Sequence, residues 1–213
     1  MKELDNLLAA QQSYFRSSLS SSSVKDRIHK IKTIRKWIID NRSHVIDSCL
    51  KDYRKPLSEF YATEFNPVLN HIDFTLKNVK KWACRKSVWT PIHLFGTKSK
   101  IYYEPKGVCL IISPWNYPLN LTLNPIISAI ASGNCMMVKP SEFTPHTSNL
   151  IKKIIDEIFH QKEISVIEGD YTIGAYLVKM KFDHIFFTGS PEIGKIVMES
   201  ASKNLTSVRV SFR

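Results

Sequence analysis

The 213-residue chain has no long apolar run, few glycines and no closely spaced cysteines. No stretch approaches the roughly 20 consecutive apolar residues of a membrane-spanning helix, and acidic residues in the first segment argue against a secretion signal. The four cysteines lie far apart, so no C-x-x-C pair indicates a zinc site or a redox dithiol. The sequence therefore predicts a soluble, cytoplasmic protein whose thiols are free and buried.

The composition excludes two further classes. Hydrophobic residues make up 43% and charged residues 23%, with only 7 glycines and 10 prolines, which is the composition of a globular protein and excludes wholesale disorder. The length corresponds to one domain, or to one domain and part of another, and excludes a repeat array.

Positive charge is concentrated in the first hundred residues, which hold 19 lysines and arginines against 9 acidic residues. Such a surplus can serve nucleic-acid binding, because lysine and arginine release counterions from phosphates. Here the charges fill the gaps between apolar residues that recur every three or four positions: Val24, Ile28, Ile31, Ile34 and Ile38. That pattern is typical of the solvated face of an amphipathic helix. No nucleic-acid-binding motif accompanies it, so we expect no nucleic-acid partner and keep that function as the weakest alternative.

Hydrophobic periodicity divides the chain into parts. Residues 1–88 have a helical period, residues 89–104 resemble an extended β arm, and from residue 105 short apolar runs alternate with amphipathic stretches. The helices expected in the first part are 2–17, 24–39, 43–54 and 59–82. The strands expected later lie in GVCLIIS, NCMMVK, ISVIEG and DHIFFTG, and the helices near 121–132, 146–160, 171–179 and 191–202. Strands without polar alternation, joined by helices, predict a doubly wound parallel α/β sheet.

Ligands bind such sheets outside the carboxyl ends of the strands. The segments expected there are SPWNYP (113–118), KPSE (139–142), EGD (168–170) and TGSPEIG (188–194). Two prolines fix the path of the first segment, so Asn116 could aim its amide at an oxyanion, or it could simply cap the next helix with Trp115 in the core.

The other two motifs also have a functional and a structural interpretation. Lys139 and Glu142 could hydrogen-bond the vicinal hydroxyls of a ribose, or form an ordinary surface ion pair. Gly189 and Ser190 could present a phosphate site at a helix start, or form a turn in which Gly194 packs against the sheet. Phosphate, ribose and oxyanion donors on one sheet together favour a dinucleotide enzyme that acts on a carbonyl group.

Three motifs of the sequence resemble a known family. SPWNYP, GNCMMVKPSE and FDHIFFTGSPEIGKIVMESASKNLT, in that order, resemble the aldehyde dehydrogenase superfamily, in particular its class 3, fatty-aldehyde-like branch. The resemblance runs from about residue 10 to Val208. It implies the oxidation of an aldehyde to a carboxylic acid with NAD or NADP as the cofactor, and dimerisation through the arm.

The resemblance also implies roles for single residues. Asn116 would donate to the oxyanion of the thiohemiacetal, Lys139 and Glu142 would hold the adenosine ribose, and the 189–194 loop would line the pyrophosphate and nicotinamide. The residues expected on the cofactor side are Pro114, Trp115, Lys139, Glu142, Gly189, Ser190 and Gly194. No metal site is expected.

The sequence departs from the family pattern near its end. In the family a glutamate that serves as general base follows the KNLTSV segment, and the nucleophilic cysteine lies later in a separate catalytic domain, whereas here the sequence reads RVSFR. We therefore expect residues 105–208 to form a cofactor domain without its last strands, residues 209–213 to be a tail outside the family pattern, and the chain to be inactive alone. A non-catalytic dinucleotide-binding or oligomerisation module is the alternative.

None of the chain's own cysteines is expected to replace that nucleophile. Cys109 and Cys135 lie in predicted buried strands, and Cys49 and Cys84 lie on predicted helices away from the strand ends. His184, just before a strand, is interpreted as a turn residue and not as a base.

Overall fold

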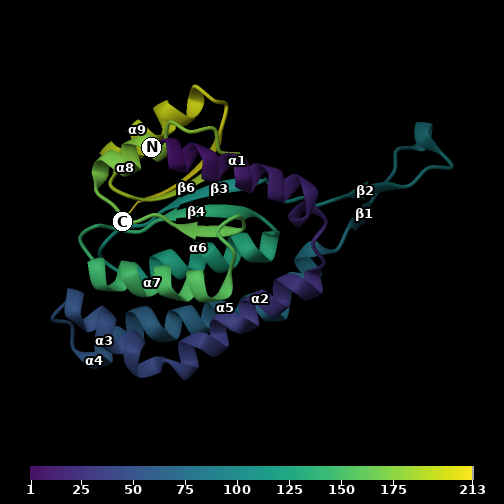
Figure 1. Cartoon of the computed structure of the whole chain (residues 1–213). Coiled ribbons are helices and arrows are strands. Elements are labelled where there is room, and N and C mark those ends of the chain that lie inside the picture. The colour runs from purple at the N-terminus through teal and green to yellow at the C-terminus, as the bar shows by residue number, and fades with distance from the viewer. Residues whose placement is uncertain (213) are drawn as a thin grey trace.

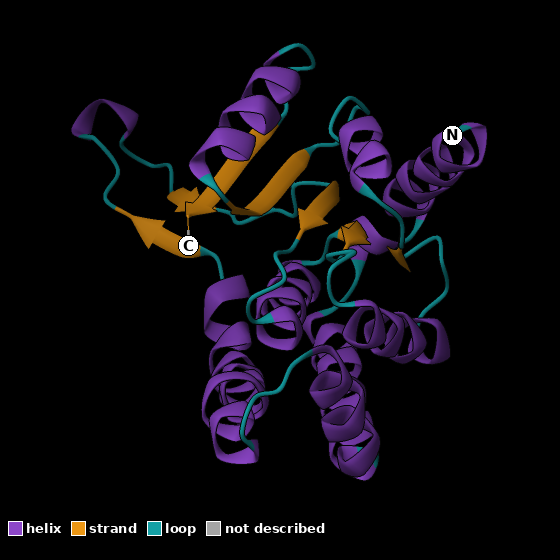
Figure 2. Ribbon diagram, turned by 90° about the vertical axis from the view of Figure 1, so that its left-hand side faces the viewer, coloured by secondary structure: helices purple, strands orange, loops and turns teal. Residues whose placement is uncertain are grey.

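A computed structural model describes residues 1–212. Its centre is a parallel five-stranded sheet with helices on both faces, from which a two-stranded arm projects (Figure 1 and Figure 2). The strands are β3 (Val108–Ile112), β4 (Cys135–Lys139), β5 (Ile164–Val166), β6 (His184–Gly189) and β7 (Ser207–Phe212). Their order is β5-β4-β3-β6-β7, which confirms the predicted doubly wound sheet and places its topological switch point between β3 and β6.

The two faces of the sheet carry different sets of helices. On one face lie α6 (Pro118–Ser132) and α7 (Pro145–Ile158), with α2 (Val24–Asp40), α3 (Arg42–Asp52) and α5 (Asn66–Ala83) outside them (Figure 1). On the other face lie α1 (Lys2–Ser17), α8 (Tyr171–Leu177) and α9 (Pro191–Ser202). Because side chains alternate along a strand, Cys109 and Ile111 join the first core and Val108 and Leu110 join the second.

Helix α1 is fastened to the sheet by a buried glutamine. The side-chain amide of Gln11 donates to the carbonyl oxygens of Met136 at 3.1 Å and Gln161 at 2.9 Å, and to the Ser165 hydroxyl at 3.1 Å. These acceptors belong to β4, to β5 and to the turn before β5. The first helix of the chain is therefore held by two strands from much later in the sequence.

The helices of the N-terminal region lie close to their predicted positions. Helix α2 begins at a capping box between Ser23 and Asp26, and its predicted apolar stripe is buried at Ile31, Ile34 and Ile38. The helix predicted at 59–82 runs without a break from residue 57 to residue 83 and consists of α4 (Leu57–Phe60), a π-helical turn η2 (Tyr61–Phe65) and α5. Pro67, in the first turn of α5, has no N–H group to donate to the preceding turn, and the π turn lies directly before it.

The arm is a hairpin of β1 (Lys86–Val88) and β2 (Ser99–Ile101), paired antiparallel, with a short 3₁₀ turn η3 (Ile92–Leu94) between them. It extends away from the body of the molecule (Figure 1). The pairing begins three residues before the predicted start at residue 89, so the expected boundary at 88 and 89 falls inside the hairpin.

The predicted tail at 209–213 is wrong for residues 209–212. These residues continue strand β7, which pairs in parallel with β6 from Ser207 opposite His184 to Phe212 opposite Gly189. Val208 and Val210 are two positions apart, so both point to the core beneath α9. The sheet thus contains a strand that the sequence interpretation omitted, and Arg213 lies outside the described residues.

Among residues 1–212, no helix combines the length and apolarity needed to cross a bilayer.

Candidate functional site

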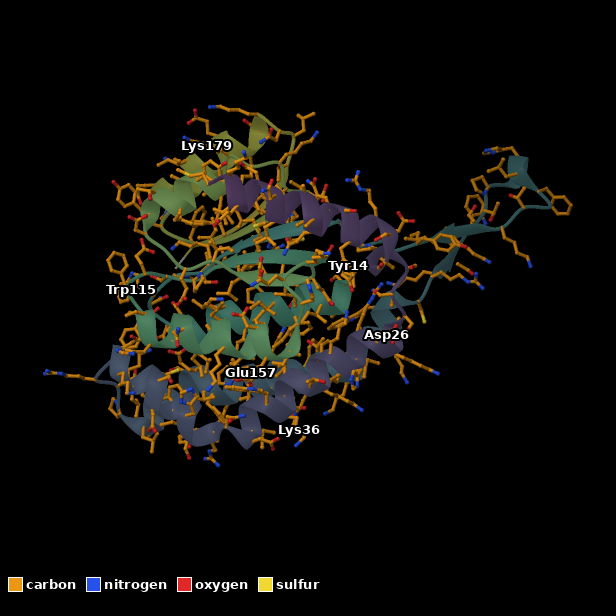
Figure 3. All side chains as sticks on the ribbon, viewed as in Figure 1. Tyr14, Asp26, Lys36, Trp115, Glu157 and Lys179 are labelled. Carbon is orange, nitrogen blue, oxygen red and sulfur yellow. The ribbon has the colours of Figure 1, made fainter. Side chains whose placement is uncertain are left out.

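Three of the predicted ligand-binding segments lie side by side at one edge of the sheet. Ile112, the last residue of β3, is opposite Lys139 on β4 and opposite Phe187 on β6. Neighbouring strands are about 5 Å apart, so the loops after β4, β3 and β6 span about 10 Å in that order. This carboxyl edge lies at the end of the molecule away from the arm, as the position of Trp115 shows (Figure 3).

The loop after β3 holds Asn116 in a fixed position. Ser113 donates its backbone N–H to the Lys139 carbonyl at 3.1 Å and its hydroxyl to the Leu121 carbonyl at 3.2 Å. The first residue before α6 is Tyr117, so Asn116 does not cap that helix, and Trp115 is 55% exposed instead of lying in the core. Within residues 1–212, the side-chain oxygen of Asn116 is buried without a hydrogen-bond partner. The structural alternative for this segment therefore does not hold.

Lys139 and Glu142 form an ion pair between a buried lysine and a glutamate whose side chain is 32% exposed. The Lys139 ammonium donates to a Glu142 carboxylate oxygen at 2.9 Å and to the Pro140 carbonyl at 3.0 Å, and its side chain is only 4% exposed. The pair adjoins a pocket of about 180 Å³ that Glu168 and Gly169 also line. Because an ammonium has three N–H donors and a carboxylate has several acceptor positions, the pair retains both a donor and acceptors for a ligand.

The loop after β6 is less open to a phosphate than its sequence suggests. The Ser190 hydroxyl caps α9 by accepting from the Ile193 N–H at 3.4 Å, and Pro191 has no N–H. The backbone N–H of Glu192 and the Ser190 hydroxyl lower the pKa of the Glu192 carboxyl, so a negative charge of the chain already lies at this helix start.

Gly194 has a packing role in this structure. It is buried, and a Cβ there would lie 2.8 Å from Phe212 and 3.0 Å from Val210. Gly194 thus lets α9 approach β7 closely, which supports the structural interpretation of this glycine. Of the predicted loop residues, Gly189 and Ser190 are the ones that lie at the carboxyl edge.

Sequence reasoning missed two charged residues that reach the same edge from the N-terminal region. Lys55 donates to the carbonyl of Asn116 at 2.9 Å, and Glu64 accepts from the backbone N–H groups of Leu119 at 3.0 Å and Asn120 at 3.2 Å. Burial raises the pKa of Glu64, against the hydrogen bonds from Asn120 and Lys55, which lower it. The only signal in the sequence was the turn around Lys55 between two predicted helices.

The four thiols are free, and none belongs to a strand-end loop. Burial raises the pKa of Cys49, Cys109 and Cys135 to about 12 in each case, so these thiols stay protonated near neutral pH. Cys84 is exposed at the end of α5, which corrects the expectation that all four are buried. His184 lies at the amino end of β6, away from the carboxyl edge, with its Nδ1 2.8 Å from the Ser207 hydroxyl oxygen.

A larger hollow than the pocket beside Glu142 lies elsewhere. It has a volume of about 540 Å³ and is lined by α6 and by side chains of β3 and β6, among them Cys109, Pro125 and Phe186. It lies along a face of the sheet, away from the ion pair of Lys139 and Glu142. The candidate site is therefore the carboxyl edge of the sheet and not this hollow.

Comparison with known proteins identifies the family. The sequence pattern of the aldehyde dehydrogenase family matches residues 1–212. The chain belongs to the aldehyde dehydrogenase family. The match includes residues 209–212, in agreement with their place in β7.

Individual aldehyde dehydrogenases agree with this assignment. The chain is 41% identical over 194 residues to 4,4'-diaponeurosporen-aldehyde dehydrogenase of Staphylococcus aureus, covering 91% of this chain and 42% of that protein. It is 36% identical over 188 residues to aldehyde dehydrogenase family 3 member A2 of Pongo abelii, covering 88% and 39%. Family 3 members among the relatives confirm the predicted branch.

Solved aldehyde dehydrogenases have the same fold. The structure of Staphylococcus aureus AldH in a substrate-bound state superposes with a TM-score of 0.94 at 38% identity, covering 98% of this chain and 45% of that one. Betaine aldehyde dehydrogenase of the same species, in complex with NAD+, superposes with a TM-score of 0.89 at 30% identity, covering 98% and 41%. The chain spans 36% to 44% of the length of the curated relatives.

Proposed function

We propose that the chain binds NAD or NADP at the carboxyl edge and serves in the oxidation of an aldehyde to a carboxylic acid. The observation that carries this proposal is the buried Lys139 ammonium paired with the partly exposed Glu142 carboxylate, which lines a pocket on the strand next to the Asn116 loop. A ribose presents neighbouring hydroxyls that both donate and accept, and the ion pair offers the matching acceptors and donor. Pro114 and Trp115 would form the wall beside the nicotinamide.

The bound cofactor would supply the hydride acceptor. None of the described thiols lies at this edge to add to the aldehyde carbon first, so this chain would contribute the cofactor site and the oxyanion donor, while the nucleophile would come from a separate catalytic domain. Asn116 would donate its side-chain amide to the oxygen that becomes negatively charged, and a donor held in place before the reaction stabilises that charge most effectively. Gly189 and Ser190 would face the pyrophosphate, which must come close to the carboxylate of Glu192. We therefore assign most of the affinity to the ribose contacts at Lys139 and Glu142.

The assignment is tested by calorimetry with NAD, NADP and ADP-ribose on the 213-residue chain. We expect dissociation constants near 1 mM, or about 4 kcal/mol of binding free energy, because the open site leaves much of the ligand in water. Lys139→Ala should weaken NAD and ADP-ribose alike, since both contain the adenosine ribose. Asn116→Ala should leave both affinities almost unchanged, because its proposed partner is the substrate oxygen.

Circular dichroism of each variant provides the control for folding, and Glu142→Ala replaces Lys139→Ala if the latter does not fold. Binding that survives both ribose-site substitutions but is lost in Asn116→Ala would show that the loops have been assigned in the wrong order. No binding of any dinucleotide to the folded chain would refute the proposed function.

We also propose that the arm at 89–104 mediates homodimerisation. Three large side chains near its tip are almost fully in contact with solvent: Trp89 is 80% exposed, Ile92 is 84% exposed and Phe95 is 92% exposed. An apolar group of this kind on a projecting hairpin is typical of a surface that another protein covers.

Cytoplasmic location remains a prediction from the sequence.

Sedimentation velocity tests the dimer. The chain should sediment as a dimer at micromolar concentration, and a triple substitution of Trp89, Ile92 and Phe95 to serine should yield monomers. Exchanging the exposed Phe74 on α5 for serine is the matched control and should leave the dimer intact. A chain that stays monomeric at 100 times that concentration would contradict the proposal.

A further inference from the structure

Lys55 and Glu64 hold the backbone where the loop that carries Asn116 leads into α6. Lys55 donates to the Asn116 carbonyl at 2.9 Å and to a Glu64 carboxylate oxygen at 3.2 Å. The other Glu64 oxygen accepts from the first N–H groups of α6, those of Leu119 and Asn120. We call Lys55 and Glu64 the loop clamp, because the two residues together bind the backbone on either side of Tyr117.

The loop clamp is shielded from water. The side chain of Lys55 is 15% exposed and that of Glu64 is 1% exposed. The Lys55 ammonium also lies 4.6 Å from the centre of the Tyr53 ring and 4.5 Å from that of the Tyr117 ring. A cation surrounded by a carboxylate, a carbonyl and two aromatic faces has a much more definite position than an exposed lysine, whose ion pairs are weak and mobile.

The local backbone explains how Glu64 reaches this position. It lies on the π-helical turn η2, immediately before α5. Such a turn contains one more residue than an α-helical turn, which changes the direction in which its side chains point, and π turns occur frequently at functional sites. A neighbouring contact reinforces the arrangement, because the Asn120 side chain donates to the Thr63 carbonyl at 3.0 Å.

Asn116 depends on its backbone for its position. In the described chain its side-chain oxygen is buried without a partner, so no hydrogen bond to that oxygen fixes the rotation of the amide. Among residues 1–212 the hydrogen bond that Asn116 makes is the one from Lys55 to its backbone carbonyl, so this residue is held through its backbone.

We propose that Lys55 is a positioning residue, which together with Glu64 holds the backbone of Asn116, and with it the side-chain amide, in the place needed to bind the oxygen of the substrate. The inference rests on the proposed function for the role of that amide, but the positioning itself is a property of the free chain. Lys55 touches neither cofactor nor substrate in this scheme. It acts through the backbone of Asn116.

The test uses the ¹⁵N-labelled 213-residue chain without ligand. Nuclear magnetic resonance follows the side-chain amide signals of Asn116, assigned by their loss in Asn116→Ala, and the hydrogen exchange of the backbone N–H groups of Leu119 and Asn120, which donate to Glu64. In Lys55→Met we expect the two Asn116 side-chain signals to move to the positions of a free amide. The backbone N–H groups should exchange about tenfold faster or more, because the local opening of the loop becomes easier.

Two further variants separate positioning from general stability. Lys55→Arg keeps a cation in reach of the Asn116 carbonyl. In this variant the Asn116 side-chain signals should return to their original positions, and the backbone N–H groups should again exchange slowly with solvent. Lys30→Met breaks another partly buried lysine pair, with Glu163, whose side chains are 23% and 10% exposed, and should leave the Asn116 signals in place. If Lys55→Met does not fold, Lys55→Met combined with Glu64→Gln replaces it, because this pair carries no unpaired buried charge and still lacks the donor to the Asn116 carbonyl.

Unchanged Asn116 signals in Lys55→Met would overturn the inference, and so would equal changes in Lys30→Met. Because no dinucleotide is present, this outcome is independent of the calorimetric test. A chain that binds no NAD would refute the proposed function and leave the positioning by Lys55 intact.

Discussion

Replacing Glu64 with alanine should lower the free energy of unfolding by about 3 to 5 kcal/mol. The substitution leaves the Lys55 ammonium buried without its counter-charge and removes the acceptor for the N–H groups of Leu119 and Asn120. Uncompensated buried groups of this kind cost far more than a lost surface contact. Urea unfolding at neutral pH, followed by far-ultraviolet circular dichroism, measures the change.

Asp73→Ala is the matched control, because Asp73 also belongs to an ion pair of the N-terminal region. Its partner is Arg35, and their side chains are 43% and 36% exposed. Exposed pairs contribute about 0 to 1 kcal/mol, so the control should unfold nearly as the unchanged chain does. Equal losses of unfolding free energy in Glu64→Ala and Asp73→Ala would contradict the prediction that the buried ion pair stabilises the chain more than the exposed one.

Replacing Gly107 with alanine should lower the free energy of unfolding by about 2 to 4 kcal/mol. Gly107 precedes the central strand β3 and has a φ of +131°, a backbone angle that residues with a Cβ rarely adopt. A Cβ there would lie 2.1 Å from the Asp183 carboxylate oxygen that accepts the Val108 N–H at 2.7 Å. The substitution therefore strains the backbone and displaces an acceptor at the start of β3.

Gly174→Ala provides the comparison within the same experiment. Gly174 lies in helix α8, its φ is unexceptional, and no atom lies within 4 Å of a Cβ built there. Alanine is the better helix former by about 1 kcal/mol, so this variant should be as stable as the unchanged chain or slightly more stable. If Gly107→Ala unfolds at the same urea concentration as Gly174→Ala, the strain inferred at residue 107 is absent.

The sequence predicted the sheet and the row of segments at its carboxyl edge, because both depend on local patterns. Buried parallel strands are short continuous apolar runs, such as the one that became β4, and a parallel sheet brings the loops after its strands to one edge. Strand β7 escaped notice because it has a different pattern. Its valines alternate with serine and arginine, since only one face of this outer strand is well covered.

The loop clamp could not be predicted in the same way. Lys55 lies 61 positions before Asn116, and Glu64 lies 55 and 56 positions before its partners, so their meeting depends on how the N-terminal helices pack against α6. The π turn that carries Glu64 leaves no clear mark on hydrophobic periodicity. For Gly194 the sequence motif was recognised, but it had two explanations, a phosphate-binding loop and close packing against the sheet. Only the close approach to β7 in the structure distinguished them.

The attachment of α1 through Gln11 has a consequence for the order in which the protein assembles. Helix α1 is synthesised long before the partners of Gln11, because Met136 follows 125 residues later and Ser165 follows 154 residues later. Helix α1 contacts β3 and β4, so it has no strand to dock on until β3 has been synthesised and cannot complete its attachment before β4 and β5, whereas α2 and α5 can pair as soon as both have emerged. Closing so long a loop delays docking, so during synthesis the apolar stripe of α1 is free for a chaperone to bind.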